Sequence, residues 1–300
     1  MEAVAVAETG IPIGSEGYAR LRRLVHDRTG FDMVSYKDRF IERRVAIRVR
    51  ATHHESFSDY LVYLSREKGE MDRLLRCLTI HVSSFLRNPS TFEAISREVF
   101  PQIFAPGASR HPRFWSVGCS RGEEPYSLAM LVHEYLGEER RGWDVQIQAI
   151  DIDDRILAEA KAGEYGWHQV ADLEPSRRER YFIHAERWRL VPEIRRMVRF
   201  HRRDILMDPP GGEYDFILCR NLLIYLDRPG QEAVLERFAR CLRPGGFLVL
   251  GRTEIFVGAG REAFEVVDSR ERIYRRLRGG EPAFSAGEAC APAAAHRGKI

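Results

Sequence analysis

The stretch FWSVGCSRGEEPYSLAM, residues 114–130, decides which fold the chain is expected to adopt. It opens with an apolar run, FWSVG, of the kind that forms buried strands. Gly118 and Gly122 then permit a tight turn, and a helix is expected near 125–136. A strand, a glycine-containing turn and a helix form the first unit of an open α/β sheet, in which ligands bind beyond the carboxyl ends of the strands.

The same alternation continues toward the C-terminus. Further strands are expected at 145–151, 214–219, 246–251, 264–268 and 272–277, with helices at 154–161 and 231–241. Strands that alternate with helices imply a parallel sheet covered on both faces, and the last two strands, which have no helix between them, predict an antiparallel hairpin. The sequence therefore predicts a doubly wound, Rossmann-like α/β domain at 113–278.

An insertion of about 163–204 interrupts this domain. Its alternating WRLV and MVRFHR stretches suggest a small hairpin, which would form a β-subdomain.

The preceding part of the chain has a helical period. Helices are expected at 18–29, 37–50, 58–65 and 71–78, the first of them ending at Gly30. We predict an all-helical N-terminal domain at 16–105 and a linker at 106–112, where Pro, Gly and Ser gather. The ends, 1–15 and 279–300, are expected to be disordered.

Composition excludes several classes of protein. With 44% hydrophobic and 30% charged residues, the 300-residue chain is not wholly disordered. Its 47 Lys and Arg against 44 Asp and Glu leave a net charge of +3, too small for binding nucleic acid or membranes by bulk charge. No run of uncharged residues approaches the roughly 18 needed to span a bilayer, so no membrane insertion is expected.

The N-terminus and the cysteines point to a cytoplasmic location. The first residues, MEAVAVAETG, lack the basic start and extended apolar core of a secretory signal. The five cysteines form no C-x-x-C pair, which argues against both a disulfide framework and a cysteine zinc site. We therefore expect reduced thiols, a cytoplasmic protein and no metal.

Acidic residues stand where a dinucleotide-binding fold would hold phosphate. The loop GCSRGEEP is not G-x-G-x-x-G, and Glu123 and Glu124 would repel a pyrophosphate. Asp151, at the end of the second strand, is placed to accept hydrogen bonds from ribose hydroxyls. S-adenosylmethionine (SAM) offers an ammonium, a sulfonium and a ribose without phosphate. Each feature alone also fits a helix N-terminus, but together they favour nucleoside binding.

Three segments, WSVGCSRGEEPYSLAM, AIDID and ILCRNLLIYLD, resemble the signatures of the CheR family. This family consists of SAM-dependent methyltransferases that esterify glutamates on bacterial chemoreceptors. The likeness covers about 18–277 and includes the segment TIHVSSFLRNP. It implies a class I SAM methyltransferase domain behind an all-helical domain, with SAM as cofactor, S-adenosylhomocysteine as product and protein-glutamate O-methyltransferase activity.

The resemblance also implies roles for individual residues. Arg87 and Tyr225 match the family's catalytic positions. Cofactor binding is implied for His81, Ser83, Arg87, Gly118, Glu124, Asp151, Asp204, Ile205, Asn221 and Leu222. The chain departs from the family pattern at four of these positions and one neighbour: His81, Ser83, Leu86, Asp204 and Ile205 stand where Asn, Thr, Phe, Asn and Leu are usual.

Basic residues form two local clusters. Ten Lys or Arg stand against four acids in 18–50, and ten Arg against three Glu in 177–203. The resemblance implies that cytoplasmic methylation helices of chemoreceptors dock on the first cluster, through Arg43, Arg44, Arg48 and Arg50. The insertion corresponds to the family's β-subdomain, but its turn IHAERW is short and lacks glycine. We therefore expect no tether to a receptor's C-terminal pentapeptide.

Three other readings compete with this one. A nucleic-acid methyltransferase is suggested by the arginine clusters and by the D-P-P-G run at 208–211. That run precedes the fourth strand and has Gly where an aromatic ring should stack on a flipped base, so no nucleic acid is expected. A SAM-binding scaffold or sensor without turnover remains open, whereas an NAD oxidoreductase lacks its glycine fingerprint.

Overall fold

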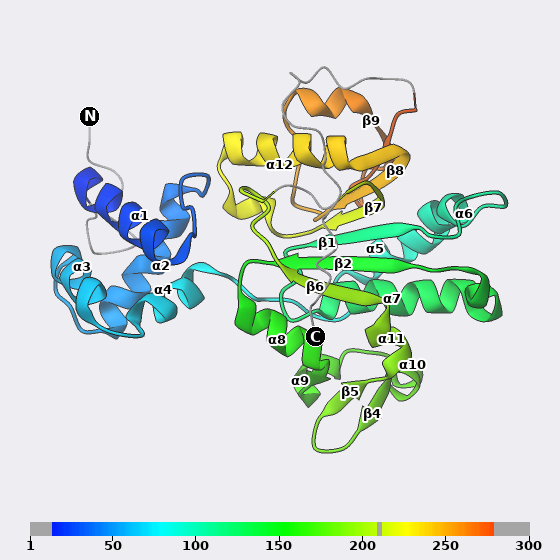
Figure 1. The fold of residues 1–300 in the computed structure, drawn as a ribbon, viewed down its shortest axis with the longest axis horizontal. Coiled ribbons are helices and arrows are strands. Elements are labelled where there is room, and N and C mark those ends of the chain that lie inside the picture. Colours follow the sequence, from blue (N-terminus) through cyan, green and yellow to red (C-terminus); the bar gives the residue numbers. More distant parts are fainter. Residues whose placement is uncertain (1–13, 209–211, 279–300) are drawn as a thin grey trace, which may run out of the picture. The chain divides into compact units, whose positions relative to one another are not determined.

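Figure 1 shows the computed structural model, which describes residues 14–208 and 212–278. Most of the ends that were expected to be disordered, and residues 209–211 of the D-P-P-G run, lie outside the described residues. The chain divides into two compact units: residues up to Ile80 together with Tyr225–Gly230, and the remainder from His81 onward.

The first unit is helical, as predicted. Its four helices are α1 Ser15–Thr29, α2 Asp38–Ala51, α3 Phe57–Arg66 and α4 Glu70–Leu78. Helix α1 ends at Gly30, whose φ of 72° is the left-handed conformation expected of a C-cap glycine. Apolar residues at helical spacing, such as Leu21, Ile41 and Leu74, are fully buried and form its core.

A buried ion pair joins two helices of this unit. The Arg48 Nε and Nη2 atoms each donate to the fully buried Glu70 carboxylate at 2.9 Å, and the Tyr60 hydroxyl donates at 3.1 Å. Burial would raise the pKa of Glu70, but the hydrogen bonds from Arg48 and Tyr60 outweigh it and lower that pKa. The Arg48 guanidinium is therefore used inside the domain, unlike the exposed side chains of Arg43 and Arg50.

The second unit contains a seven-stranded sheet in the order β6-β2-β1-β7-β8-β10-β9. Its strands are β1 Arg113–Val117, β2 Gln146–Asp151, β6 Val198–Arg202, β7 Tyr214–Cys219, β8 Leu242–Leu250, β9 Phe264–Asp268 and β10 Ile273–Arg276. The first five in spatial order are parallel. Strand β10 runs antiparallel to both β8 and β9, so the predicted closing hairpin is confirmed.

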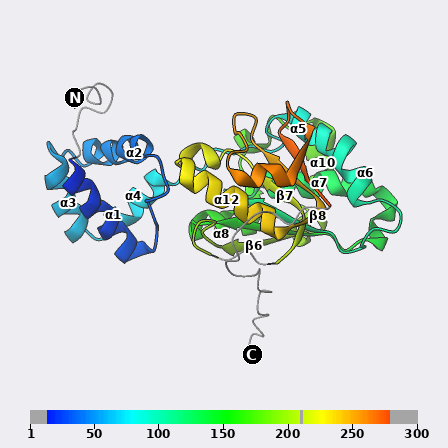
Figure 2. The same cartoon turned by 90° about the horizontal axis from the view of Figure 1, so that it is seen from above.

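Helices cover both faces of this sheet (Figures 1 and 2). After α4, the helices of the chain are α5 Pro89–Ala94, α6 Phe100–Ile103, α7 Glu123–Leu136, α8 Asp154–Ala162, α9 Trp167–Val170, α10 Pro175–Tyr181, α11 Pro192–Arg196 and α12 Arg228–Cys241. Of these, α9 and α10 lie by the small insertion rather than on the large sheet. There are also a π-helical turn Ile95–Val99 and short 3-10 turns Gly137–Gly142, Leu223–Tyr225 and Ala259–Ala263. The ring of Phe114 lies 6.3 Å from that of Phe100, whereas Trp115 packs 5.7 Å from Phe238 of α12. Since neighbouring strand residues point to opposite faces, the doubly wound, Rossmann-like architecture is confirmed.

One sequence-based expectation about the insertion was wrong. The MVRFHR stretch does not join a hairpin in the insertion: β6 pairs in parallel with β2 at the edge of the main sheet. The small sheet instead has three strands, β3 Glu164–Tyr165, β4 Phe182–His184 and β5 Trp188–Leu190, in the order β3-β5-β4. A short strand with alternating apolar and basic residues looks the same in sequence whichever sheet it joins.

The unit boundary also differs from the expected linker at 106–112. The division falls between Ile80 and His81, so α5 and α6 belong with the α/β unit. They do so because the rings of Phe100 and Phe104 pack against Phe114 of β1. The Pro- and Gly-containing stretch is a surface loop inside this unit.

In the described part of the chain, no helix combines the length and apolarity needed to cross a bilayer.

Candidate cofactor site

The loop after β1 folds over the end of β2. The N–H groups of Gly118 and Cys119 both donate to the Ile150 carbonyl at 2.9 Å. Gly118 and Ser120 have φ values of 72° and 51°, which turn the chain sharply at this point. The Ser120 N–H then donates to Asp151 Oδ2 at 2.9 Å. The first strand-to-helix loop and the acid at the end of β2 therefore face each other.

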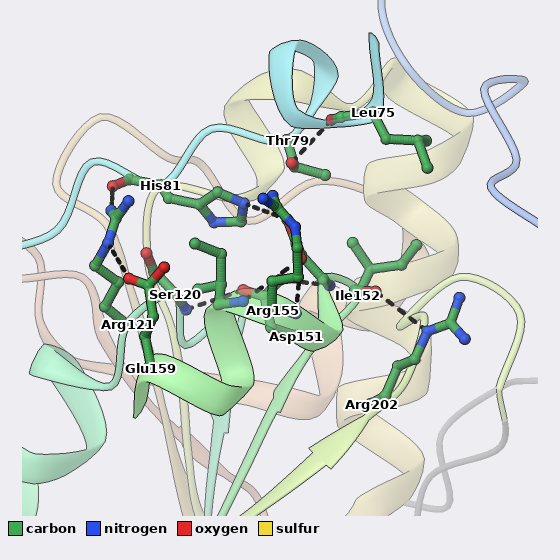
Figure 3. Close-up of polar contacts among 12 residues, drawn as sticks. Leu75, Thr79, His81, Ser120, Arg121, Asp151, Ile152, Arg155, Glu159 and Arg202 are labelled. Carbon is green, nitrogen blue, oxygen red and sulfur yellow. Dashed lines mark hydrogen bonds and ion pairs between the residues drawn. The ribbon is translucent and has the colours of Figure 1, made fainter. Parts of the chain in front are cut away.

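Asp151 is held for binding by its backbone neighbours (Figure 3). It is 9% exposed, and its Oδ1 accepts the Asp153 N–H at 3.1 Å. Burial raises the pKa of Asp151, although His81 and the N–H donors act in the opposite direction. The buried Ser120 hydroxyl oxygen beside it has no hydrogen-bond partner among the described residues. A carboxylate and an unpartnered hydroxyl side by side suit a ligand with hydroxyl groups.

His81 lies beside this pair. Its Nε2 is 3.3 Å from the Asp153 carboxylate, and its carbonyl accepts from Arg121 Nη1 at 2.9 Å (Figure 3). Arg121 also pairs with Glu159 of α8 at 2.9 Å. The segment that begins at His81 is therefore anchored to the α/β unit, and Ser83 follows in it with its side chain half-buried.

Glu124, in the first turn of α7, is the second acid of the site, and its side chain is 13% exposed. Its Oε1 accepts from the Ser116 hydroxyl at 3.2 Å, and its Oε2 lies 3.7 Å from Arg220 Nη1. Burial raises the pKa of Glu124 to about 7, and Arg220 opposes this rise. The carboxylate is thus placed to meet a cationic group of a ligand.

Arg220 was missed by sequence reasoning. Its side chain is only 2% exposed, and its Nη2 donates to the Arg87 carbonyl and to Asn88 Oδ1, both at 2.7 Å. Its guanidinium also lies over the Phe92 ring, 5.5 Å from the centroid. The only signal in the sequence was its place in CRNLLIY directly after a buried strand, where a charged residue must find partners.

Arg87 occupies a constrained stretch of backbone. Its neighbours Leu86 and Asn88 have φ values of 50° and 59°. Its half-buried side chain donates from Nη1 to the Val82 carbonyl at 2.9 Å. The Leu86 N–H donates to the Ser127 hydroxyl at 2.8 Å, which ties this stretch to α7. Arg220 therefore links two parts of the site: one of its nitrogen atoms donates to the Arg87 backbone carbonyl, and another lies 3.7 Å from the Glu124 carboxylate.

The turn after β7 is fixed by Glu254, an acid that sequence reasoning missed. The buried Glu254 accepts the N–H groups of Asn221 at 3.0 Å and Gly251 at 2.7 Å. Asn221 has a φ of 59°, and Leu222 packs beside Gly118, where its Cδ2 would be 3.5 Å from an added Cβ. The loops after β1 and β7 are therefore in contact.

Asp204 and Ile205 follow β6 in a tight turn. Asp204 accepts the Leu206 N–H at 2.8 Å, and Ile205 is 8% exposed. Arg237 of α12 donates to the carbonyls of Ile205 and Leu206 and so fixes the turn. Tyr225 is in the helical unit: its carbonyl accepts the Lys37 N–H at 3.0 Å, and its ring lies 4.9 Å from Phe40.

These residues fit SAM. The buried carboxyl of Asp151, the largely buried carboxyl of Glu124 and the unpartnered Ser120 hydroxyl oxygen match a cationic ligand with ribose hydroxyls. The two acids would repel a dinucleotide's phosphates. In the described residues, no group of three or more His, Cys, Asp or Glu side chains is arranged to hold a metal ion.

Comparison with known proteins identifies the family. The CheR methyltransferase SAM-binding domain matches residues 81–273, and the CheR all-alpha domain matches 16–79. A chemotaxis protein methyltransferase of Listeria monocytogenes is 33% identical over 81% of this chain and 92% of that protein. One from Klebsiella aerogenes is 31% identical over 87% and 91%.

Two further similarities complete the comparison. The probable biofilm formation methyltransferase WspC of Pseudomonas aeruginosa is 36% identical over 78% of this chain and 56% of that protein. Among solved structures, the glycopeptide N-methyltransferase MtfA aligns over 52% of this chain and 55% of that chain, with a TM-score of 0.32 and 13% identity. On the domain matches and the chemotaxis relatives, the chain belongs to the CheR family of SAM-dependent methyltransferases that act in chemotaxis.

Proposed function

We propose that this methyltransferase esterifies glutamate side chains on the cytoplasmic methylation helices of chemoreceptors and releases S-adenosylhomocysteine. The observation that carries the proposal is the link, through buried Arg220, between the cofactor acid Glu124 and the Arg87 segment. The link runs through the Arg87 backbone carbonyl, and the charge of Arg87 also acts to lower the pKa of Glu124. Both observations support a carboxylate substrate beside the cofactor's amino-acid end. The chemotaxis methyltransferases among its relatives support the same substrate.

The chemistry requires positioning more than proton transfer. When bound, SAM supplies an electrophilic methyl group. A glutamate with an ordinary pKa of about 4.3 is already an ionised nucleophile at neutral pH. Arg87 orients this carboxylate through charge-assisted hydrogen bonds. The CheR resemblance gives Tyr225 a second catalytic role. Arg87 must not hold the carboxylate too tightly, because the carboxylate loses charge in the transition state.

Receptor docking uses the exposed face of α2. Arg43 and Arg50 are exposed there, and Arg44 lies over the Phe40 ring at 5.6 Å. These three residues form a basic surface that complements glutamate-rich helices. We leave Arg48 out of this surface because Glu70 engages its guanidinium. We also propose a cytoplasmic location, because the methylation helices of receptors lie there. We propose no tether to a receptor's C-terminal pentapeptide, because the turn between β4 and β5 is short. In that turn the Ala185 N–H donates to the Arg187 carbonyl at 3.1 Å.

One assay tests the substrate. Purified protein is incubated with tritiated SAM and either receptor-containing membranes or total RNA. We expect label on the receptor that alkali releases as methanol, which marks a carboxyl ester. Alkali-stable label on nucleosides would contradict the proposal, and cofactor binding without any transfer would indicate a scaffold.

Replacing Asp151 with alanine should weaken S-adenosylhomocysteine binding about ten- to a hundredfold. A lost hydrogen bond to a charged group is worth about 1.5–3 kcal/mol. The Asp151→Asn variant keeps the shape and one acceptor oxygen, so it should lose less affinity. Isothermal titration calorimetry measures both variants, and an unchanged affinity in Asp151→Ala would remove Asp151 from the cofactor site.

Cofactor affinity should rise as the pH increases through the pKa of Glu124, about 7. Below that pH the carboxyl is protonated and neutral, and above it the carboxylate attracts the cofactor's ammonium. Titrations between pH 6 and 8 should therefore show tighter binding at the higher pH, with proton release on binding. The Glu124→Gln variant should bind weakly with no such dependence, whereas a dependence that persists in it would assign the effect to another group.

A further inference from the structure

A cavity of about 410 Å³ lies along β6, the edge strand of the seven-stranded sheet. Helices α7, α8 and α11 complete its wall (Figure 1). Its volume falls within the range typical of small-molecule sites, roughly 300–1,000 Å³. The cavity shares no residue with the cofactor-binding set, so the methyltransferase chemistry does not explain it.

The lining of this cavity is basic on one side and apolar on the other. Tyr126, Val198 and Phe200 supply its buried apolar surface. The basic lining residues are Lys161, Arg195, Arg196, Arg199 and His201. None of the lining residues is acidic.

The lysine and arginine side chains of this lining are not neutralised by acidic neighbours. Within the described residues, no carboxylate lies at ion-pair distance from any of the five basic side chains. Arg195 donates to the Lys161 carbonyl at 3.0 Å and also interacts with the Tyr126 hydroxyl, and neither partner is a carboxylate. Burial lowers the pKa of His201, and nearby Arg203, Lys161 and Arg199 lower it further. Like charges this close repel one another, and an anion in the cavity would relieve the repulsion.

A neighbouring cavity of about 400 Å³ extends the same charge. Arg196 and Arg199 line both cavities, and Arg140 and Arg141 line the second, together with the acids Asp144 and Glu193. The first cavity therefore has the more strongly basic lining, because the second cavity contains acids and the first does not.

From this placement we propose that the cavity beside β6 binds a small phosphate-bearing anion. Guanidinium groups present planar pairs of N–H donors that match phosphate oxygens, and three arginines converge here. Several unneutralised cations suit a multiply charged phosphate better than a single carboxylate. A compact cavity with a buried apolar side favours a small molecule over an extended acidic chain.

Calorimetric titration of the full chain with inorganic pyrophosphate tests this site. The cofactor site is first saturated with S-adenosylhomocysteine, and sodium chloride holds the ionic strength constant. We expect saturable binding of one pyrophosphate per chain. Arg195→Gln and Arg199→Gln should each weaken that binding at least tenfold, because each removes a charged pair of donors.

Arg97→Gln is the matched control, since Arg97 is exposed and paired with Glu98 outside the cavity. It should bind pyrophosphate like the unmodified protein. Unchanged S-adenosylhomocysteine affinity in all three variants shows that each is folded. Absent saturable binding, or equal binding in all variants, overturns the site. Stronger competition by a glutamate-rich peptide than by pyrophosphate overturns it in favour of a protein partner.

Discussion

Replacing Arg87 with alanine should slow methyl transfer roughly 10²- to 10³-fold while leaving cofactor binding within about tenfold of the unmodified protein. The lost guanidinium would no longer orient the substrate carboxylate, and removing a single positioned donor of this kind slows catalysis roughly 10²- to 10³-fold. The backbone carbonyl of Arg87 stays available to Arg220, so the local fold should persist. Tritium transfer to receptor membranes and calorimetry with S-adenosylhomocysteine measure the two quantities.

Two comparisons make this prediction specific. Arg87→Lys keeps the charge but loses the planar pair of donors, so it should retain intermediate activity. Arg97→Gln removes an exposed arginine from another surface and should be fully active. Loss of cofactor binding in Arg87→Ala together with unchanged binding in Asp151→Ala would contradict the prediction. It would mean that Arg87 binds the cofactor and Asp151 does not.

Replacing Arg220 with methionine should destabilise the protein by about 3–5 kcal/mol, as expected when one partner of a buried pair is removed. The change leaves Glu124 without its nearby cation and frees the Arg87 carbonyl and the Asn88 side chain. Because the Glu124 carboxyl would then hold its proton to higher pH, cofactor affinity at neutral pH should fall as well. Urea unfolding and calorimetry at pH 7 measure the two effects.

A double variant separates the ion pair from general packing. Adding Glu124→Gln to Arg220→Met removes the uncompensated buried acid, so part of the lost stability should return. Arg220→Lys keeps the charge without the fork that reaches both Arg87 and Asn88, and it should be less damaging than methionine. Additive losses in the double variant would show that Glu124 and Arg220 are not coupled.

The local pattern of the chain predicted most of the fold. The helices of the first unit, the strand and turn at 114–122 and the closing hairpin follow from periodicity and glycine positions. The acids Asp151 and Glu124 could be placed because a strand end and a helix start are visible in sequence. These features depend on residues a few positions apart.

The CheR resemblance added what the pattern did not contain. Roles for Arg87, Asn221 and Tyr225 came from matching motifs, since each of these residues alone is compatible with a capping, turn or packing role. The structure brings His81, Asp151 and the loop after β1 together in one unit, and it gives Arg48 a partner in Glu70 that the surface pattern of α2 did not suggest.

By itself, the sequence determined the alternation of strands and helices and the acids at the strand ends, because short-range spacing and backbone preference control both. Only the tertiary structure decided that β6 is the sheet edge and that Arg220 is a buried link between Arg87 and Glu124. Arg220 lies 133 positions from Arg87 in the chain. Contacts at such separation depend on how whole elements pack, and no local pattern records them.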